Sequence, residues 1–188
     1  TDTVDYLTSF NEPNVGVTVN LTSGLATDAG GATDTLTNIE NVQGTKFNDT
    51  ITGNSVANSL SGLDGVDTFV GSAGNDILRG SSNFEEFATN YSVATYSTGT
   101  LGLTVTGSST SGTVVSSEFG TDTLINIDAL IGGSGADTFS ATGIEFEGLG
   151  GNDTFTNVQR VRYDNSTAGV TVSLATGIAF DGFGGTDS

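Results

Sequence analysis

The sequence predicts an all-β solenoid built from nonapeptide repeats, and three observations lead to this fold class. Four consecutive nine-residue blocks run without a gap from Gly44: GTKFNDTIT, GNSVANSLS, GLDGVDTFV and GSAGNDILR. A longer repeat overlays them, because TDTLTNIENV at 33–42 returns as TDTLINIDAL at 121–130, an offset of 88 residues. Apolar residues alternate at period two between glycine-rich turns, which indicates short strands. Repetition at fixed periods is the signature of stacked repeat architectures.

Composition limits both the partners and the chemistry. The 188 residues include 22 acidic and only 4 basic ones, for a formal net charge of −18. Nucleic acid and anionic membrane surfaces need clustered Lys and Arg, so we expect neither as a partner, and no apolar run is long enough for membrane insertion. The chain has no Cys and no His, which leaves no disulfide and no ordinary catalytic base. We therefore expect no enzyme activity.

Two long repeat units and the opening of a third organise the chain. Each opens with a tyrosine and an alternating apolar strand: Tyr6 with GVTVNL (16–21), Tyr96 with GLTVT (102–106) and Tyr163 with GVTVSL (169–174). We expect a first solenoid unit over 1–80, a second over 93–156 and a truncated third over 157–188. The segments 81–92 and 107–120 break the register, so both are expected to project as loops, the second being rich in Ser and Thr.

Each position of the nonapeptide has a physical role. Glycine at the first and fourth positions allows a tight turn, because glycine reaches positive φ without a Cβ clash. The sixth position supplies a carboxylate, and the apolar residue two places later points into a narrow core. Two blocks complete a coil of about eighteen residues, so alternate blocks stack. Asp49 and Asp67 should then lie on one edge of the solenoid, and Asn58 and Asp76 on the other.

Stacked turns of this kind bring oxygen atoms together. Carboxylates and backbone carbonyls from successive coils would form an all-oxygen cage, which suits Ca²⁺ better than Mg²⁺, since Ca²⁺ tolerates irregular geometry and six to eight ligands. Zinc and copper prefer His or Cys, and the chain has neither. We expect several Ca²⁺ ions, and the candidate metal-binding residues are Asp34, Gly44, Asp49, Asn58, Gly62, Asp64, Gly65, Asp67, Gly71, Gly74, Asp76, Asp122, Gly132, Gly135, Asp137, Gly148, Gly150, Asp153 and Asp187.

These blocks resemble the RTX (repeats-in-toxin, haemolysin-type) calcium-binding repeats, whose nonapeptide is G-G-x-G-x-D-x-U-x. GSAGNDILR, GLDGVDTFV, GGSGADTFS (132–140) and GLGGNDTFT (148–156) match it well. The resemblance implies a right-handed parallel β-roll with calcium between its turns, type I secretion and folding only in calcium-rich surroundings. Some positions depart from the pattern. Asn58 replaces Asp, Val56 and Phe47 replace the inner glycine, and Asp34 and Asp122 sit in imperfect loops.

The function expected from these features is structural. The chain reads as a segment of a large secreted bacterial surface protein, such as an adhesin stalk, S-layer or filament subunit, that folds on binding Ca²⁺ after export. Its expected partners are neighbouring copies or flanking repeats, with cell-surface polysaccharide as a further possibility. Recurrent Thr-x-Thr pairs leave open a recognition module for carbohydrate or ice, although strand propensity explains them better. A delivery module for a secreted enzyme is the other alternative.

Overall fold

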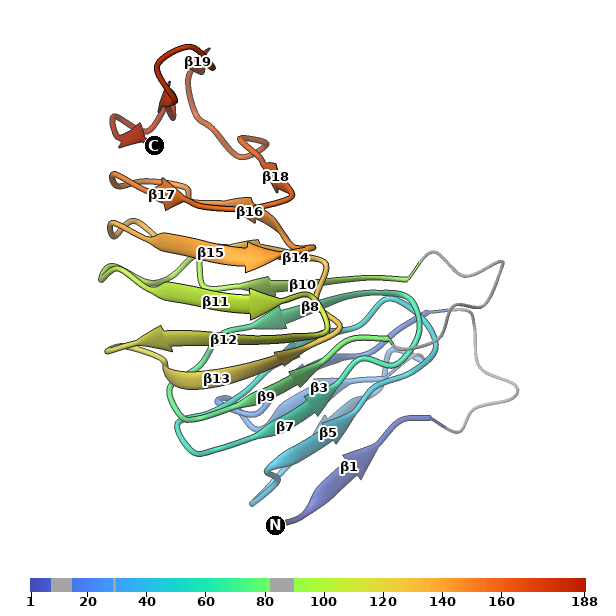
Figure 1. The fold of residues 1–188 in the computed structure, drawn as a ribbon. Helices are drawn as coiled ribbons and strands as arrows, with labels where there is room; N and C mark the ends of the chain where they lie inside the picture. Colours follow the sequence, from blue (N-terminus) through green and yellow to red (C-terminus); the bar gives the residue numbers. More distant parts are fainter. Residues whose placement is uncertain (8–14, 29, 82–89) are drawn as a thin grey trace.

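The computed structural model describes residues 1–7, 15–28, 30–81 and 90–188, which form a stack of short strands (Figure 1). Sheet A has the order β1 (Thr3–Asp5), β5 (Asn41–Gln43), β7 (Ser59–Ser61), β9 (Ile77–Arg79), β13 (Gly120–Ile125), β12 (Ser111–Ser116), β11 (Thr104–Ser108), β15 (Thr138–Thr142) and β17 (Thr154–Phe155). Sheet B has the order β18 (Arg160–Val161), β16 (Glu145–Glu147), β14 (Ala129–Ile131), β10 (Tyr91–Thr95), β8 (Val66–Val70), β6 (Thr50–Thr52), β2 (Thr18–Asn20), β3 (Leu25–Thr27) and β4 (Thr33–Thr35). β19 (Thr171–Ser173), β20 (Ile178–Phe180) and β21 (Thr186–Asp187) make a third sheet.

From β4 to β11 and from β13 to β18, successive strands alternate between sheets A and B, so the chain coils there as the nonapeptide pattern predicts. β6 pairs in parallel with β8 and β7 pairs in parallel with β9, which means that alternate blocks stack. The part of the chain that the structure describes is therefore an all-β roll whose coils stack through parallel strands. The residues that the structure describes contain no helix that is long and apolar enough to cross a membrane.

The core between the two sheets consists of one apolar side chain per strand. In sheet A the register aligns Val42, Leu60, Leu78 and Leu124. In sheet B it aligns Val19, Ile51, Phe69, Ala94, Leu130 and Phe146. All of these are at most 2 % exposed. Burying a large apolar side chain contributes about 1.5–3 kcal/mol, so these two rows provide the main driving force for stacking.

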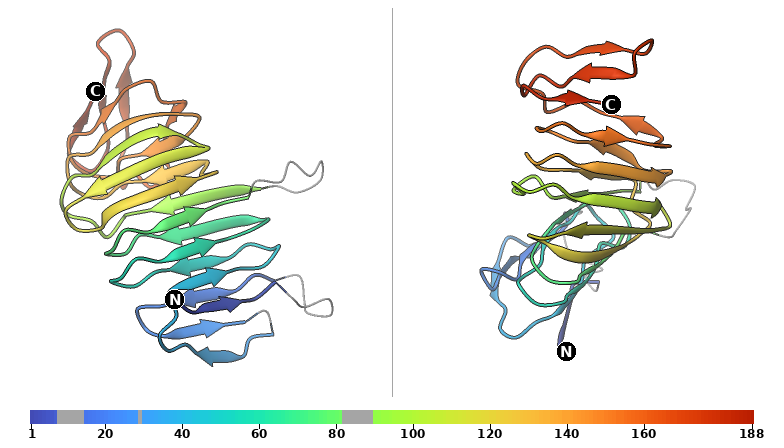
Figure 2. Two further views of the ribbon diagram at one scale, coloured as in Figure 1. Left: turned by 60° about the horizontal axis from the view of Figure 1, so that its bottom comes forward. Right: turned by 60° about the vertical axis from the view of Figure 1, so that its left-hand side comes forward.

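A three-stranded antiparallel meander interrupts the parallel coil in each long unit. These meanders are β2–β3–β4, β11–β12–β13 and β19–β20–β21. The expectation of a projecting loop at 107–120 is wrong, because β12 pairs with both β11 and β13 and buries Val114 in the core. Burial alternates along that strand, with Gly112, Val114 and Ser116 buried and Val115 exposed, although Ser and Gly dominate the composition of the segment. Figure 2 shows the meanders of the second and third units as part of the stack.

The expected loop at 81–92 is only partly described. Residues 82–89 lie outside the described residues, and Tyr91 and Ser92 belong to β10, which continues sheet B beside β8.

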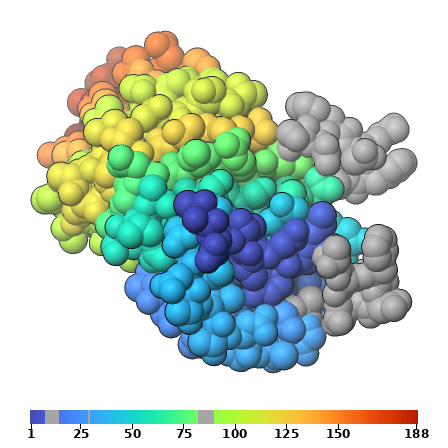
Figure 3. Space-filling view, turned by 90° about the horizontal axis from the view of Figure 1, so that it is seen from below, coloured from blue at the N-terminus to red at the C-terminus, as the bar shows by residue number. Residues whose placement is uncertain are grey.

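Seen from the N-terminal end (Figure 3), residues of β1 and of the first meander form the near face.

Candidate metal centre

The Asp at the sixth position of the nonapeptide points into the roll at the corner before a strand. Asp49, Asp67, Asp76, Asp137 and Asp153 are at most 2 % exposed. Proteins rarely bury Asp so completely unless it is paired. The same position that sequence reasoning chose for metal binding therefore places a row of carboxylates inside the molecule.

Each of these carboxylates binds the backbone of the neighbouring coil through Oδ1. On one edge the Val17 N–H donates to Asp49 at 2.7 Å, and the Asp49 N–H donates to Asp67 at 3.0 Å. On the other edge the Asn58 N–H donates to Asp76 at 2.9 Å. The edges are those predicted from the block stacking, and Asn58 keeps its place in the row.

The row extends into the later units. The Asp76 N–H donates to Asp122 at 2.9 Å, the Asp137 N–H to Asp153 at 2.8 Å and the Asp153 N–H to Asp187 at 3.1 Å. Hydrogen bonds from backbone N–H groups favour the ionised carboxylate. One carboxylate oxygen of each Asp, Oδ1, thus links two coils. The partners of the second oxygen, Oδ2, determine whether the site can also hold a cation.

Glycine at the first position makes room for that second oxygen. A Cβ on Gly44 would stand 2.2 Å from Asp49 Oδ2 and 3.2 Å from the carbonyl oxygen of Gly62. A Cβ on Gly132 would stand 2.1 Å from Asp137 Oδ2 and 3.0 Å from the carbonyl oxygen of Gly148. A carboxylate and a glycine carbonyl from adjacent coils thus face one point, as the predicted oxygen cage requires.

Two of the second oxygens are buried without a hydrogen-bond partner. They are Asp67 Oδ2 and Asp153 Oδ2. Burial raises the pKa of each carboxyl to about 7, and the neighbouring carboxylates Asp49 and Asp137 respectively add to the rise. A buried acceptor without a donor costs about 1–3 kcal/mol. These two oxygens therefore fit a bound hard cation, which would supply the missing positive charge.

The other nonapeptide carboxylates have protein donors for both oxygens. Asp49 Oδ2 accepts the Thr45 N–H at 2.6 Å, and Asp137 Oδ2 accepts the Gly133 N–H at 3.1 Å. Asp76 Oδ2 accepts the Ser72 hydroxyl at 2.8 Å. Burial raises the pKa of Asp137 to about 6, and it also raises the pKa of Asp49 and Asp76.

The imperfect repeat loops end in Thr-Asp (the TD motif). In each of them a tyrosine hydroxyl donates a hydrogen bond to the second carboxylate oxygen of the Asp. Tyr96 donates to Asp122 Oδ2 at 2.7 Å, and Tyr163 donates to Asp187 Oδ2 at 3.0 Å. The third such pair, Tyr6 with Asp34 at 3.3 Å, is exposed on β4, so Asp34 lies outside the buried row. The sequence contained both members of each pair, but only the fold brings residues so far apart in the chain together.

The turn glycines follow the expected pattern with two differences. Gly65 and Gly74 adopt φ values of 113° and 133°, as the fourth position predicts. In the last block the glycine with positive φ is Gly151, which is the fourth position (φ 116°), whereas the candidate Gly150 stands at the third position. Gly135 does not have positive φ, but a Cβ there would stand 2.4 Å from the backbone N of Gly102, so the close approach of that backbone requires glycine.

The remaining candidate residues belong to these turns or border them. Gly71 packs against Tyr96, whose ring would meet a Cβ there at 2.4 Å. Asp64 is half-buried in its turn, where the Ser81 hydroxyl donates to its Oδ1 at 2.9 Å. Among the described residues, no three His, Cys, Asp or Glu side chains are grouped to hold a metal ion. Any cation site there must consequently combine one or two carboxylates with backbone carbonyls.

Sequence reasoning did not single out two buried acids. Asp181, in the turn before β21, is 0 % exposed, and Glu147 is 2 % exposed and bound by the backbone and side-chain N–H groups of Asn165. A signal for Asp181 was available, because AFDGFGGTD aligns with ATDAGGATD, where Asp28 holds the same place. The two arginines near Tyr163 pair with acids, Arg160 with Glu145 at 3.0 Å and Arg162 with Asp164.

Comparison with known proteins agrees with this geometry. The family model for the RTX calcium-binding nonapeptide repeat matches four copies over residues 34–55, 61–83 and 126–143. No curated protein matches the chain significantly. The matched segments contain Asp49, Asp67, Asp76 and Asp137 of the buried row, and repeats of this family bind Ca²⁺. The chain therefore contains RTX calcium-binding nonapeptide repeats.

Proposed function

We propose that this chain is a calcium-dependent structural module of a secreted cell-surface protein, which gains its folded form on meeting Ca²⁺ outside the cell. In this role it serves as a rigid spacer in an adhesin stalk, a surface layer or an extracellular filament. Type I secretion fits such a chain, because an acidic array that stays unfolded without calcium can be exported as an extended polypeptide.

The buried second oxygens of Asp67 and Asp153 carry this proposal. Neither has a hydrogen-bond donor, and both belong to rows in which the next carboxylate is one coil away. Ionised carboxylates in such surroundings repel one another and lose their hydration, so a metal-free fold at neutral pH is penalised. Ca²⁺ removes both penalties, and its binding energy then becomes folding energy.

A calcium titration followed by far-UV circular dichroism tests the proposal, with Mg²⁺ as the control ion. We expect a cooperative gain of β signal at roughly 10⁻⁴–10⁻³ M Ca²⁺, the range of extracellular calcium modules, and little response to Mg²⁺. Full β signal in excess chelator at pH 7.5, unchanged by calcium, would contradict calcium-driven folding.

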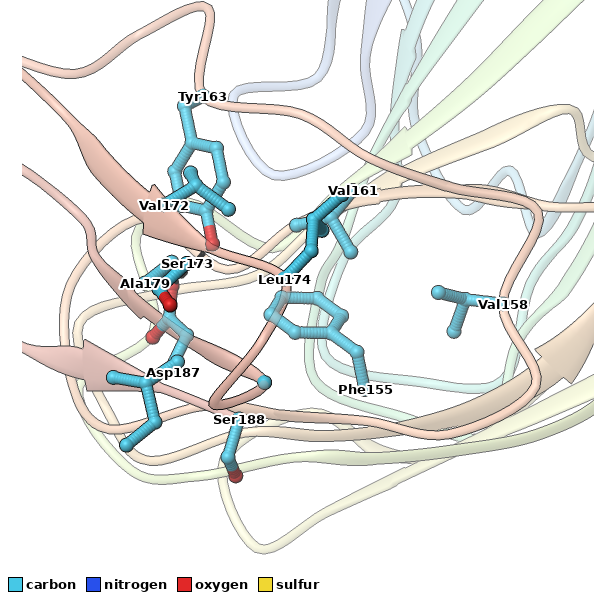
Figure 4. A pocket seen from close by; sticks show the side chains of 12 residues that line it. Phe155, Val158, Val161, Tyr163, Val172, Ser173, Leu174, Ala179, Asp187 and Ser188 are labelled. Atoms are coloured by element: carbon cyan, nitrogen blue, oxygen red, sulfur yellow. Dashed lines mark hydrogen bonds between the residues drawn. The ribbon is translucent and has the colours of Figure 1, made fainter.

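The module is further proposed to stack on a following coil of the same repeat type, from a flanking repeat or a neighbouring copy. An apolar pocket of about 470 Å³ lies beside the third meander, with Phe155, Val161, Val172 and Leu174 among its lining residues (Figure 4). Val172 is 54 % exposed, whereas its equivalents Val19 and Val105 are buried under the next coil. The pocket is thus the uncovered end of the core.

Sedimentation velocity in millimolar Ca²⁺ tests the stacking. We expect concentration-dependent association of the wild-type chain, which Val172→Lys abolishes by placing a charge on the apolar end. The matched substitution Val115→Lys, at a position that is 50 % exposed on β12, should leave association unchanged. A wild-type chain that stays monomeric at all concentrations would contradict stacking between copies.

A recognition role is supported by one surface feature, and it remains the second candidate. Thr104, Thr138 and Thr154 are aligned across β11, β15 and β17, and all three are exposed. A second row aligns Thr18, Thr50 and Thr68 across sheet B. Rows of hydroxyls at strand spacing suit ordered water or sugars. Ice-affinity and glycan-binding assays on the calcium-loaded protein would detect this role, and Thr138→Lys should then abolish it.

A further inference from the structure

A hollow of about 440 Å³ lies on the outer face of sheet B, over β16 and β18. Phe146 of β16 is buried in the core, so its neighbour Glu145 and the paired Arg160 of β18 point to the opposite face. Tyr91 reaches this face from β10 across β14, where the small side chain of Ala129 lies in register with Glu145. The volume of the hollow is within the range of ligand pockets, roughly 300–1,000 Å³.

The polar side chains of this hollow hold one another in place. Glu145 Oε1 pairs with Arg160 Nη1 at 3.0 Å, and Glu145 Oε2 accepts the Tyr91 hydroxyl at 2.9 Å. Arg162 Nη1 donates to the same hydroxyl at 3.0 Å, and Arg162 Nε donates to Asp164 Oδ2 at 2.7 Å. A ligand that binds here meets side chains that are already ordered, which lowers the entropy cost of binding.

Polar atoms remain available on two sides of the hollow. The Arg160 side chain is 65 % exposed, and among the described residues Glu145 is its ion-pair partner. A guanidinium has five N–H donors in one plane, so Arg160 keeps several of them for a ligand. Asp164 is 61 % exposed and contacts Arg162 through Oδ2, which leaves Oδ1 as an acceptor.

The charges of the hollow select the class of ligand. Arg160 and Arg162 are two of the four basic residues of the chain, and Glu145 and Asp164 balance them. An anion is attracted by the two guanidinium groups but repelled by the two carboxylates and by a chain of net charge −18. A cation is repelled by the two guanidinium groups. A neutral molecule with several hydroxyl groups meets neither repulsion, and each hydroxyl can both donate and accept.

We propose that Arg160 and Asp164 bind a neutral sugar unit of a polysaccharide in this hollow. The planar fork of Arg160 donates to two neighbouring ring hydroxyls, and Asp164 accepts from a third. Glu145 and Arg162 are positioning residues, because they orient the Arg160 and Asp164 side chains. The site shares no residue with the threonine rows or with the buried carboxylate row, so it adds a binding function to the structural one.

NMR spectroscopy of the arginine side chains tests the site in the folded, calcium-loaded protein. The chain has three arginines, so a ¹H–¹⁵N spectrum contains three Nε–H signals, and Arg79 of β9 is an internal control. The probes are the methyl glycosides of glucose, galactose and mannose, with glucuronate and sulfate as anionic probes. We expect a saturable shift of the Arg160 signal with at least one neutral glycoside at millimolar concentration, and no shift of the Arg79 signal.

Arg160→Gln should weaken the binding of that glycoside by about tenfold or more, because it removes charge-assisted hydrogen bonds. Binding to the variant is followed through the backbone amide signals of residues 160–164. Arg79→Gln makes the same change of charge at an exposed position of sheet A and should bind like the wild type. Circular dichroism verifies that both variants keep the β signal of the wild type.

Three outcomes would overturn the site. One is the absence of a saturable shift of Arg160 with any of the three neutral glycosides. Binding of glucuronate or sulfate alone would mean that the hollow selects an anion and not a neutral sugar. A glycoside that binds Arg160→Gln as tightly as the wild type must bind elsewhere on the protein.

Discussion

A single residue type, Asp at the sixth position, both links the coils and creates their need for a cation. Its Oδ1 accepts a backbone N–H across the coil boundary, as Asp67 does from Asp49 and Asp153 does from Asp137. Its Oδ2 is then satisfied by a local N–H, by a hydroxyl or by nothing in the protein. The repeats therefore differ in calcium demand although their sequences look alike.

Replacing Asp67 by Asn should have opposite effects with and without calcium. Asn keeps an oxygen for the Asp49 N–H but removes the buried charge, so the metal-free protein should gain stability, by about 1–3 kcal/mol. The increase in melting temperature on adding Ca²⁺ should shrink. Thermal denaturation with chelator and with calcium measures both effects. Asp5→Asn, an equal change of charge at an exposed site, should alter neither.

The metal-free protein should lose stability as pH rises. Burial raises the pKa of Asp67 and Asp153 to about 7 and that of Asp122 to about 6, whereas Asp in an unfolded chain titrates near 4. Between about pH 4 and pH 7 the folded state then holds protons that the unfolded state has released, so the free energy of unfolding falls with increasing pH. Urea denaturation of calcium-stripped protein across this range measures the slope.

The double variant Asp67→Asn/Asp153→Asn serves as the control for that pH dependence, and its slope should be flatter. Calcium should also flatten it, because the cation replaces the protons. A free energy of unfolding that rises from pH 4 to pH 7 in the metal-free wild type would contradict the assignment.

Among the elements, the meander is the part that the repeat pattern least reveals. The second and third meanders join a parallel coil through the Asp of the TD motif in their last strand. A tyrosine just after the strand that precedes the meander donates to the second oxygen of that Asp. Tyr96 is 0 % exposed, packs edge-on against Phe119 with centroids 5.1 Å apart, and its ring lies over Gly71. The hydroxyl thus takes the place that a donor or cation must otherwise fill.

Tyr96→Phe should consequently destabilise the protein by about 1–3 kcal/mol, since it leaves Asp122 Oδ2 buried without a donor. The Tyr6→Phe change removes the exposed bond to Asp34 and should stay within about 0.5 kcal/mol. Chemical denaturation of both variants in saturating calcium makes the comparison. Equal losses in the two variants would mean that the hydroxyl bond does not matter at the buried site.

The strands of the nonapeptide array make a simpler prediction. Phe69→Ala should cost about 3–5 kcal/mol, because the side chain is 0 % exposed and fills the core between Ile51 and Ala94. Phe180→Ala, at a site that is 57 % exposed, should cost less than 1 kcal/mol. Thermal melting in calcium distinguishes them.

The sequence predicted the elements that depend on local period and missed those that depend on pairing at a distance. Stacking of alternate blocks followed from the spacing of Gly, Asp and one apolar residue, and it is confirmed. The strand β12 was mistaken for a loop, because its Ser-rich composition hides an alternation that only its partners β11 and β13 make meaningful. The alignment of Asp181 with Asp28 marks the position but not its burial, because Asp28 is only half-buried and Asp181 is 0 % exposed.

At the scale of the whole molecule, the protein is a one-dimensional stack in which each coil contacts mainly its neighbours. Its free energy of unfolding should then be a sum of contributions from the single coils and from the contacts between neighbouring coils. The nonapeptide coils contribute the aligned apolar side chains of the core. The second and third meanders contribute the Tyr–Asp hydrogen bonds that attach them to the coils. Under the proposed function, calcium binds between neighbouring nonapeptide coils and couples them, so we expect folding along the stack to be cooperative.

The alternation of strands between sheets A and B has a consequence for arrays of different length. Six single strands, β5 to β10, separate the first meander in sheet B from the second in sheet A, whereas five, β14 to β18, separate the second from the third, which joins β17 of sheet A. Parity thus decides which side a meander faces. Inserting or deleting nine residues turns everything downstream by half a revolution, while eighteen residues only change the length. The number of nine-residue blocks therefore determines on which side of the roll the next meander lies, and a change by one block should move that meander to the opposite side.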